Sequence, residues 1–474
     1  MRKWIPLTAI CVGAFMLLVD VSIVNTALPD MSEDLHSTFT ALQWVVDVYA
    51  LTLAALLMAF GSLGDRLGHR RLYLGGLAVF GLASLACALA PDAGTLIAAR
   101  AAQGIGGAAM MTSTTALLNA AYHGRERGTA FGIWGAVNGA ASAAGPILGG
   151  VLTQQFGWRS IFLVNLPIAA LAAILTLRHL PAGRARTTGR PDLAGAAAFT
   201  LFVAALVYGL IESGEHGWTD TPVLGPLAVA ALALAAFVTV ELRTAHPLLD
   251  LGLLRNRAFL GLALAGLLLT AAAFTQLTYT GLWLQQVLHL SPLRAGLAVS
   301  ALPAAAFVTA PTASRLLRTA APRLPIALGL ALIGGGTLLL TLVSPASGWT
   351  VLLPGLLITG VGVGFATPPM MAVALAAVPR ERAGMASGAI NTARQLGFAL
   401  GIALLGTLFQ TSLRHHPGPD ARHAYAAALD GVYTVAGAAG LLAAALVVLL
   451  VRRPTAPAAA APAATQAERV TAGN

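Results

Sequence analysis

Fourteen long apolar runs follow one another along this 474-residue chain, separated by short segments that hold arginine, proline or acidic residues. A helix needs about 20 apolar residues to cross a bilayer, and each run is close to that length. Charged residues make up only 10% of the chain, whereas soluble domains carry about 25%. The chain is therefore predicted to be an all-α polytopic membrane protein. The predicted spans are 5–28, 42–63, 72–90, 96–118, 129–152, 160–178, 193–211, 223–242, 259–284, 293–314, 324–343, 350–375, 384–409 and 427–451.

Several function classes are disfavoured by residues that the sequence lacks. Lys3 is the single lysine, so no nucleotide-binding P-loop with its internal lysine is present. All ten histidines fall in loops or at span ends, and neither a His-Glu-x-x-His nor a Gly-x-Ser-x-Gly motif occurs. The net charge of +10 arises from loop arginines rather than from a nucleic-acid surface. We therefore expect no enzyme activity, no metal, no cofactor beyond a proton gradient and no nucleic-acid partner.

The basic residues predict the orientation in the membrane. With the N-terminus inside, 22 of the 28 basic residues fall on the cytoplasmic side. This distribution follows the positive-inside rule for an even number of spans, so both termini are predicted to be cytoplasmic. The exceptions are Arg100 and Arg394, which lie within spans, and Arg159, Arg294, Arg414 and Arg422, which lie outside.

An internal repeat indicates a two-fold architecture. At an offset of 256 residues, five glycines of the first half match glycines of the second half, in register across two neighbouring spans. The repeat predicts a six-helix N-terminal half over 1–190, two inserted helices over 191–245 and a six-helix C-terminal half over 246–453. The Ala/Pro-rich segment 454–474 is predicted to be a disordered cytoplasmic tail. The matched pairs are Gly104/Gly360, Gly106/Gly362, Gly132/Gly388, Gly145/Gly401 and Gly150/Gly406.

Three charged residues are predicted to lie within the outer half of the membrane, at similar depths. They are Asp20 in the first span, Asp47 in the second and Arg100 in the fourth. Charges inside a span are costly, by about 2.5–3.5 kcal/mol each, so each needs a reason. One interpretation is a proton-coupling site in which Arg100 controls the protonation of Asp20, with Asp47 attracting cations in a cavity. The alternatives are a static ion pair that fixes helix packing and an interfacial Asp47.

Polar and small residues elsewhere suggest further sites. Gln276 stands at the repeat position of Asp20 and could line a cavity with Tyr279 and Trp283, although an aromatic stripe is also typical of packing. Asn391 and Arg394 lie mid-span and are candidates for the same cavity. The fifth span is crowded with small residues, which let helices approach closely, and with a proline that kinks the helix. Its candidates for a pliable seal between the halves are Gly145, Pro146, Gly149 and Gly150.

Four segments together resemble motifs of the major facilitator superfamily. Residues 61–71 (GSLGDRLGHRR) resemble its loop signature, and residues 96–107 (LIAARAAQGIGG) its fourth-span motif. Residues 145–150 (GPILGG) resemble its antiporter motif, and 17–29 (LLVDVSIVNTALP) the first-span motif of fourteen-span drug:proton antiporters. The second half lacks a matching loop signature between 315 and 324.

The resemblance implies proton-coupled efflux of hydrophobic drugs or antibiotics by alternating access, from a monomer in a bacterial plasma membrane. It also implies that the loop motif acts as a latch between the two halves, in which Asp65 pairs with a basic residue or a helix N-terminus. Plain positive-inside anchoring remains an alternative for the arginines. Residues carried over by the loop and fourth-span motifs are Gly61, Gly64, Asp65, Arg66, Gly68, Arg70, Arg71, Gln103 and Gly104.

Two other functions remain open from the sequence. A dedicated exporter or importer of one metabolite would use the same fold and the same buried charges. A membrane scaffold or sensor that transports nothing would have no use for charges buried at one depth. Growth inhibition across a panel of compounds separates these possibilities.

Overall fold

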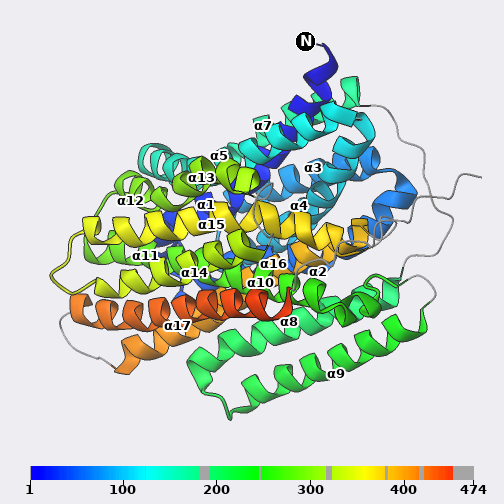
Figure 1. The fold of residues 1–474 in the computed structure, drawn as a ribbon. Coiled ribbons are helices and arrows are strands. Elements are labelled where there is room, and N and C mark those ends of the chain that lie inside the picture. Colours follow the sequence, from blue (N-terminus) through cyan, green and yellow to red (C-terminus); the bar gives the residue numbers. More distant parts are fainter. Residues whose placement is uncertain are drawn as a thin grey trace, which may run out of the picture.

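A computed structural model shows an entirely helical arrangement over the residues that it describes, which are 2–122, 124–180, 192–244, 247–316, 323–378, 383–415 and 421–451 (Figure 1). The predicted tail 454–474 and the charged turn 379–382 lie outside these ranges. The main helices are α1 (Ile5–Asp34), α2 (Phe39–Leu67), α3 (His69–Ala88), α4 (Ala93–Ala121), α5 (Gly124–Phe156), α6 (Ser160–Leu163), α7 (Asn165–His179), α8 (Leu193–His216), α9 (Thr221–Arg243), α10 (Arg257–Ala273), α11 (Gln276–Leu282), α12 (Pro292–Val299), α13 (Ala301–Leu316), α14 (Arg323–Leu339), α15 (Leu352–Ala376), α16 (Ala383–His415) and α17 (Ala421–Leu450).

These helices confirm the predicted all-α membrane fold. Thirteen segments of the described chain are long and apolar enough to cross a membrane. Three of them combine consecutive α-helices, namely α6 with α7, α10 with α11, and α12 with α13, and two more join α14 or α15 to a short 3₁₀ turn. The predicted fourth span is not among these thirteen. It corresponds to α4, which has 29 residues and so a length of about 43 Å. Arg100, Gln103 and many small polar residues make α4 less apolar than the other spans.

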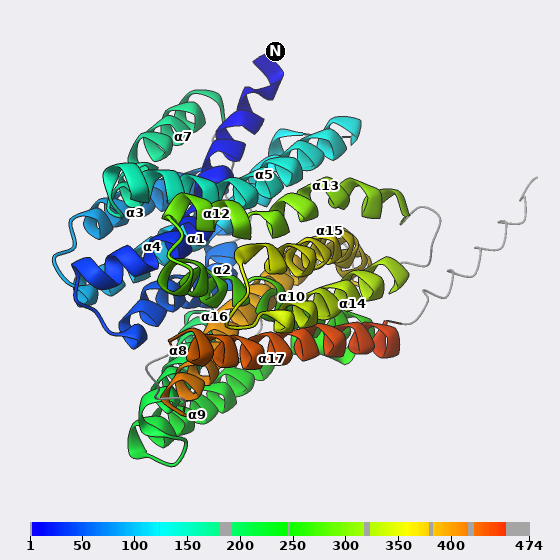
Figure 2. The same ribbon diagram turned by 90° about the vertical axis from the view of Figure 1, so that its left-hand side faces the viewer.

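The helices form two groups joined by a seam, with a helix pair added at one edge. Helices α1 to α7 pack together, as do α10 to α17, and the groups meet where α2 contacts α16 and α5 contacts α12 and α13. Figure 2 shows α5 beside α12 and α13. The pair α8 and α9 packs through α8 onto both α2 and α16, while α9 lies on the outside (Figure 1).

Matched glycines of the internal repeat make equivalent contacts in the two groups. A Cβ on Gly104 would lie 2.7 Å from the backbone of α2, and one on Gly360 would lie 2.1 Å from the backbone of α13. Gly145 likewise packs on α1, and Gly401 packs on α10. In each pair the small residue allows two helices to approach more closely than any side chain would permit. The exact boundaries of the two halves and of the insertion stay a prediction.

The ninth predicted span is broken at the repeat position of Asp20. Helix α10 ends at Ala273 and α11 begins at Gln276, and a π-helical turn over Trp283–Val287 follows. A widened turn of this kind interrupts the regular i→i−4 ladder and is frequent at functional positions.

Helix α1 begins and α17 ends on the same side of the bundle (Figure 1). We call this side the basic face because Arg66, Arg70, Arg71, Arg178 and Arg243 lie at helix ends there. The other side is called the opposite face. This placement agrees with an even number of spans, which stays a prediction.

The side of the membrane that the basic face occupies stays a prediction, which cysteine labelling can check. His179→Cys, at the exposed end of α7, should react only with a membrane-permeable reagent in intact cells. Trp218→Cys, where the native side chain is 54% exposed at the opposite face, should react with an impermeant reagent. The native Cys11 and Cys87 are buried and give a low background. The reverse labelling pattern would refute the assigned orientation.

Candidate functional site: a buried carboxylate network

Asp20 is at the centre of a hydrogen-bonded network inside the N-terminal group of helices. Its Oδ2 atom accepts a 2.7 Å hydrogen bond from Nη1 of Arg100. Its Oδ1 atom accepts hydrogen bonds from Nε2 of Gln103 at 2.9 Å and from Nδ2 of Asn165 at 2.8 Å. A charged carboxylate is therefore fully satisfied here, although Asp20 is 0% exposed. The predicted contact between Asp20 and Arg100 is present.

Arg100 is enclosed as completely as its partner. Its Nε atom donates a 3.0 Å hydrogen bond to the carbonyl of Val45 on α2. Its guanidinium also lies 4.2 Å from the centre of the Tyr49 ring, where a cation and an aromatic face attract each other. The Arg100 side chain is 1% exposed. Removing either partner of such a buried pair costs about 3–5 kcal/mol, because the remaining charge is left uncompensated.

Two members of the network were missed by the sequence interpretation. Asn165 begins α7, and Ser84 on α3 accepts a 2.8 Å hydrogen bond from Nε2 of Gln103. Both are small polar residues inside otherwise apolar runs, and this was the signal that could have identified them. With Tyr49, the network draws on α1, α2, α3, α4 and α7. All five helices belong to the N-terminal group.

Asp47 does not join this network. It follows Val45 by two residues, which places it on the other side of α2, near Tyr279 of α11. Both carboxylate oxygens lack a hydrogen-bond partner, and the residue is 0% exposed. Asp47 lies only about 3 Å along the helix axis from Val45, so the predicted similar depth of the three charges is retained, but only Asp20 and Arg100 are in contact. The burial of Asp47 also keeps it away from lipid headgroups in this conformation.

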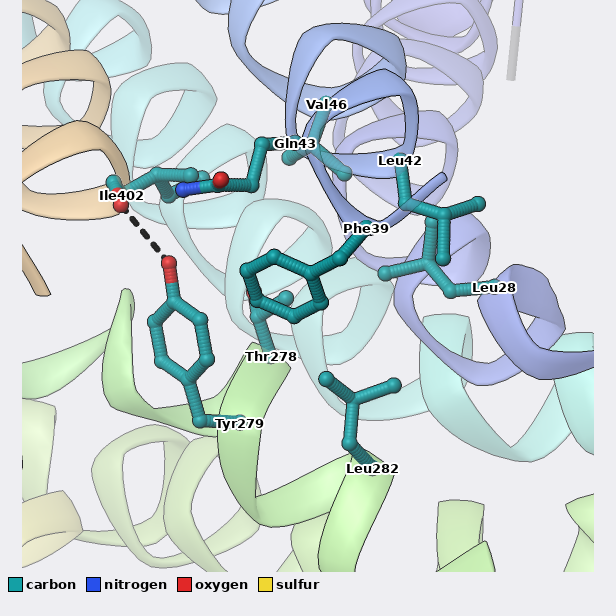
Figure 3. A pocket seen from close by; sticks show the side chains of 9 residues that line it. All are labelled: Leu28, Phe39, Leu42, Gln43, Val46, Thr278, Tyr279, Leu282 and Ile402. Atoms are coloured by element: carbon teal, nitrogen blue, oxygen red, sulfur yellow. Dashed lines mark hydrogen bonds between the residues drawn. The ribbon is translucent and has the colours of Figure 1, made fainter. Parts of the chain in front are cut away.

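The predicted second-half wall is closed in this structure. Tyr279 donates a 2.7 Å hydrogen bond to the carbonyl of Ile402, and Figure 3 shows its ring beside Phe39 and Thr278. The cavity between them measures about 10 Å³, whereas drug sites occupy about 300–1,000 Å³. Gln276 and Trp283 are also fully buried. Tyr279 and Trp283 belong to the apolar core of the C-terminal group, and Gln276 hydrogen-bonds to Thr280 within it. Any role in substrate binding therefore requires another conformation.

Arg394 lies in the C-terminal group, between α16, α10 and α15. A Cβ on Gly266 of α10 would lie 3.2 Å from Cγ of Arg394 and 3.6 Å from Met370 of α15, so Arg394 packs against both helices. The Nε atom is buried without a hydrogen-bond partner. Asn391, one turn earlier in α16, is partly exposed. The two residues therefore share one region of the chain's interior, separate from the Asp20 network.

Comparison with known proteins identifies the family. The sequence model that describes the Major Facilitator Superfamily matches residues 10–402 of this chain. The chain belongs to this superfamily. The multidrug resistance protein Stp of Mycobacterium tuberculosis is 38% identical over 89% of this chain and 80% of its own length. The tetracenomycin C resistance and export protein of Streptomyces glaucescens is 33% identical over 86% of this chain and 76% of its own.

A solved structure supports the same fold. A peptide transporter, POT, crystallised in complex with sulfate, superposes with a TM-score of 0.67 at 17% identity. The match covers 94% of each chain. This fold therefore extends over almost the whole chain.

The antiporter-like motif lies at the seam of this facilitator. A Cβ on Gly149 would lie 2.7 Å from the Ile23 carbonyl of α1. One on Gly150 would lie 2.4 Å from the backbone of α12, in the other group. Across the same contact, the Pro146 carbonyl approaches Gly296 of α12. With Gly145, these residues hold α5 against both groups without intervening side chains, as a pliable seal would require.

The loop signature forms the tight turn between α2 and α3. Gly68 has φ = 87°, a left-handed conformation that glycine adopts without strain. Arg70 donates a 2.7 Å hydrogen bond to the carbonyl of Leu177 at the end of α7, so it anchors two helices of its own group. Gly61 has open space around its Cα, whereas Gly64 packs beside His69. Arg66 lies in the last turn of α2, while the side chain of Asp65 and the residue Arg382 lie outside the described parts. The latch stays a prediction.

Proposed function

We propose that this facilitator exports hydrophobic drugs or antibiotics in exchange for protons. The observation that carries the proposal is the network around Asp20, which gives a membrane-embedded carboxylate both a counter-charge and a defined set of donors. The named activities of its relatives support export of drug-like compounds. An intramembrane carboxylate of this kind is a typical proton relay in transporters.

The proton step is assigned to Asp20. In the present conformation Asp20 accepts hydrogen bonds from three side-chain donors, and we assign this arrangement to the state from which the proton has left. Protonation would remove the negative charge that attracts Arg100, so its guanidinium would be stabilised only by another acceptor. A change in the position of α4 relative to α1 would follow, and α4 packs on α2 and α3. Binding a proton thereby favours a second arrangement of the bundle, as alternating access requires.

The present arrangement is closed towards the opposite face. Thr278 of α11 donates a 3.2 Å hydrogen bond to Asn25 of α1, and Gln285 donates one to the Thr26 carbonyl. Near the same face, Gly406 of α16 packs on Gln43 of α2. The substrate path is therefore sealed by direct contacts between the two groups at this end.

Transport by purified protein in lipid vesicles tests the proposal. A pH gradient across the vesicle should drive uptake of a hydrophobic drug, and a protonophore should abolish that uptake. Proton movement across the vesicle membrane that accompanies transport of only one compound from a panel of antibiotics would favour the dedicated exporter. Uptake that needs no gradient would contradict proton coupling.

Asp47→Asn should weaken efflux of cationic dyes and quaternary ammonium compounds more than efflux of neutral drugs. When the seam opens, its unpaired carboxylate would attract lipophilic cations in a low-dielectric cleft and repel anions. Both substrate classes are measured in one efflux-deficient host, with Asp34→Asn as the matched control on an exposed carboxylate. An equal loss for both classes would end the claim of cation preference while leaving the antiporter proposal intact.

A further inference from the structure

Two buried carboxylates lie where the inserted helix pair meets the connector to the C-terminal group. Asp192 precedes α8 and accepts a 2.7 Å hydrogen bond from the backbone N–H of Gly195 through Oδ1. Glu241 lies in the last turn of α9, and its Oε2 atom accepts a 3.2 Å hydrogen bond from the N–H of Leu249. Asp192 is 6% exposed and Glu241 is 5% exposed. Each carboxylate thus has one oxygen bound to the backbone.

The second oxygen of each carboxylate has no partner, and both point to the same place. Oδ2 of Asp192 and Oε1 of Glu241 are buried without a hydrogen bond. A Cβ on Gly195 would lie 2.5 Å from the first oxygen and 2.7 Å from the second. The two oxygens therefore lie at most 5.2 Å apart. Only a glycine leaves room for this approach.

No cation among the described residues compensates for two negative charges at this point. Arg243, two residues after Glu241, is exposed, and Asp250 of the connector caps the following 3₁₀ turn. On the neighbouring α2 the charged residues are Asp47, Asp65 and Arg66, and on α16 they are Arg394 and Arg414. None forms an ion pair with Asp192 or Glu241 in the described structure.

We propose that Asp192 and Glu241 hold one proton between them at neutral pH. Two buried like charges within this distance repel each other strongly, so a state with a single proton on the pair is favoured over two ionised carboxylates. A single proton placed between Oδ2 and Oε1 gives both oxygens a hydrogen bond. The shared proton then fastens the start of α8 to the end of α9 and, through Leu249, to the connector. This site is independent of the Asp20 network and of the proposed transport activity.

A metal ion fits the site less well. Ca²⁺ takes six to eight oxygen ligands, and Mg²⁺ retains several waters. The described site offers two free oxygens in nearly full burial. A proton satisfies this donor set without any further ligand.

Infrared difference spectroscopy of the purified full-length protein tests the shared proton. At neutral pH, Glu241→Gln should lose one protonated-carboxyl band relative to the wild type, because the amide donates to Asp192 in its place. Asp192→Asn should lose the same band and serves if the first variant does not fold. Asp220→Asn, which alters an exposed carboxylate at the other end of α9, should leave the band unchanged. A band that persists in both pair variants would overturn the proposal.

The pH dependence of stability gives a second readout. The folded pair holds a proton that the unfolded chain releases at a pH of about 4, so the stability should fall as pH rises from about 4 until the folded pair also ionises, and it should level off above that pH. The Tm of the wild type should therefore fall as pH rises from mildly acidic values through neutrality, and this fall should be smaller in Glu241→Gln. Parallel curves would contradict a shared proton. Stabilisation of the wild type alone by added Na⁺, Mg²⁺ or Ca²⁺ would identify a cation site and overturn it as well.

Discussion

Asp20→Asn is expected to abolish active efflux while leaving the protein in the membrane. Asparagine keeps an oxygen that can accept from Gln103 or Asn165, but it can neither bind nor release a transported proton. A proton moving down about 100 mV releases about 2.3 kcal/mol, enough for about a fifty-fold gradient of a neutral substrate. This driving force should be lost completely. Efflux of a fluorescent drug from energised cells measures the effect.

The control for this prediction separates coupling from folding. Asp34→Asn removes an exposed carboxylate from the same helix, where the native residue pairs with Arg159, and it should leave efflux nearly unchanged. Membrane levels of each variant are compared, because Arg100 loses its counter-charge in Asp20→Asn. Protonophore-sensitive efflux that survived in Asp20→Asn would refute the assignment of the proton site.

Arg100→Ala should reduce transport severely, whereas Arg100→Lys should retain part of it. Alanine leaves Asp20 buried without a counter-charge and removes the donor to the Val45 carbonyl. Lysine keeps the charge but has no planar fork to serve Asp20, Gln103 and Val45 together, and its contact with the Tyr49 ring is weaker. Transport rate and thermal stability are both measured for each variant.

Coupling between the two residues is tested by the double variant. If Asp20 and Arg100 act as a pair, Asp20→Asn combined with Arg100→Ala should be much less destabilised than the sum of the single changes. The second substitution then removes a charge that the first had left unpaired. Simple additivity in stability and in transport would contradict the pairing.

Much of the fold could be predicted because the bilayer imposes a strong length constraint on apolar runs. The spans and the contact between Asp20 and Arg100 follow from hydropathy and from the high cost of an isolated charge. The break between α10 and α11 could not be predicted in this way. The same holds for the π-helical turn over Trp283–Val287, because such local changes depend on side-chain packing and leave the apolar pattern intact.

The candidate site was less predictable than the fold. Depth along a helix follows from residue counting, but the direction of a side chain depends on which face meets which neighbour. Asp47 and Val45 differ by only two positions, yet they face different helices. Asn165 and Ser84 carry no charge, so their burial left too weak a signal in one sequence.

The enclosure of Asp20 has a consequence for how such a pump can change. Every side chain that hydrogen-bonds to this carboxylate belongs to one half of the molecule, and none comes from the wall that contains Tyr279 and Trp283. If Asp20 carries the proton and the second-half wall contacts the drug, as proposed, proton binding and substrate selection depend on different residues. Substitutions in the second-half wall would then change which compounds are exported without disturbing the hydrogen bonds of Asp20. The substrate range of such a transporter could therefore evolve while its proton-binding site is conserved.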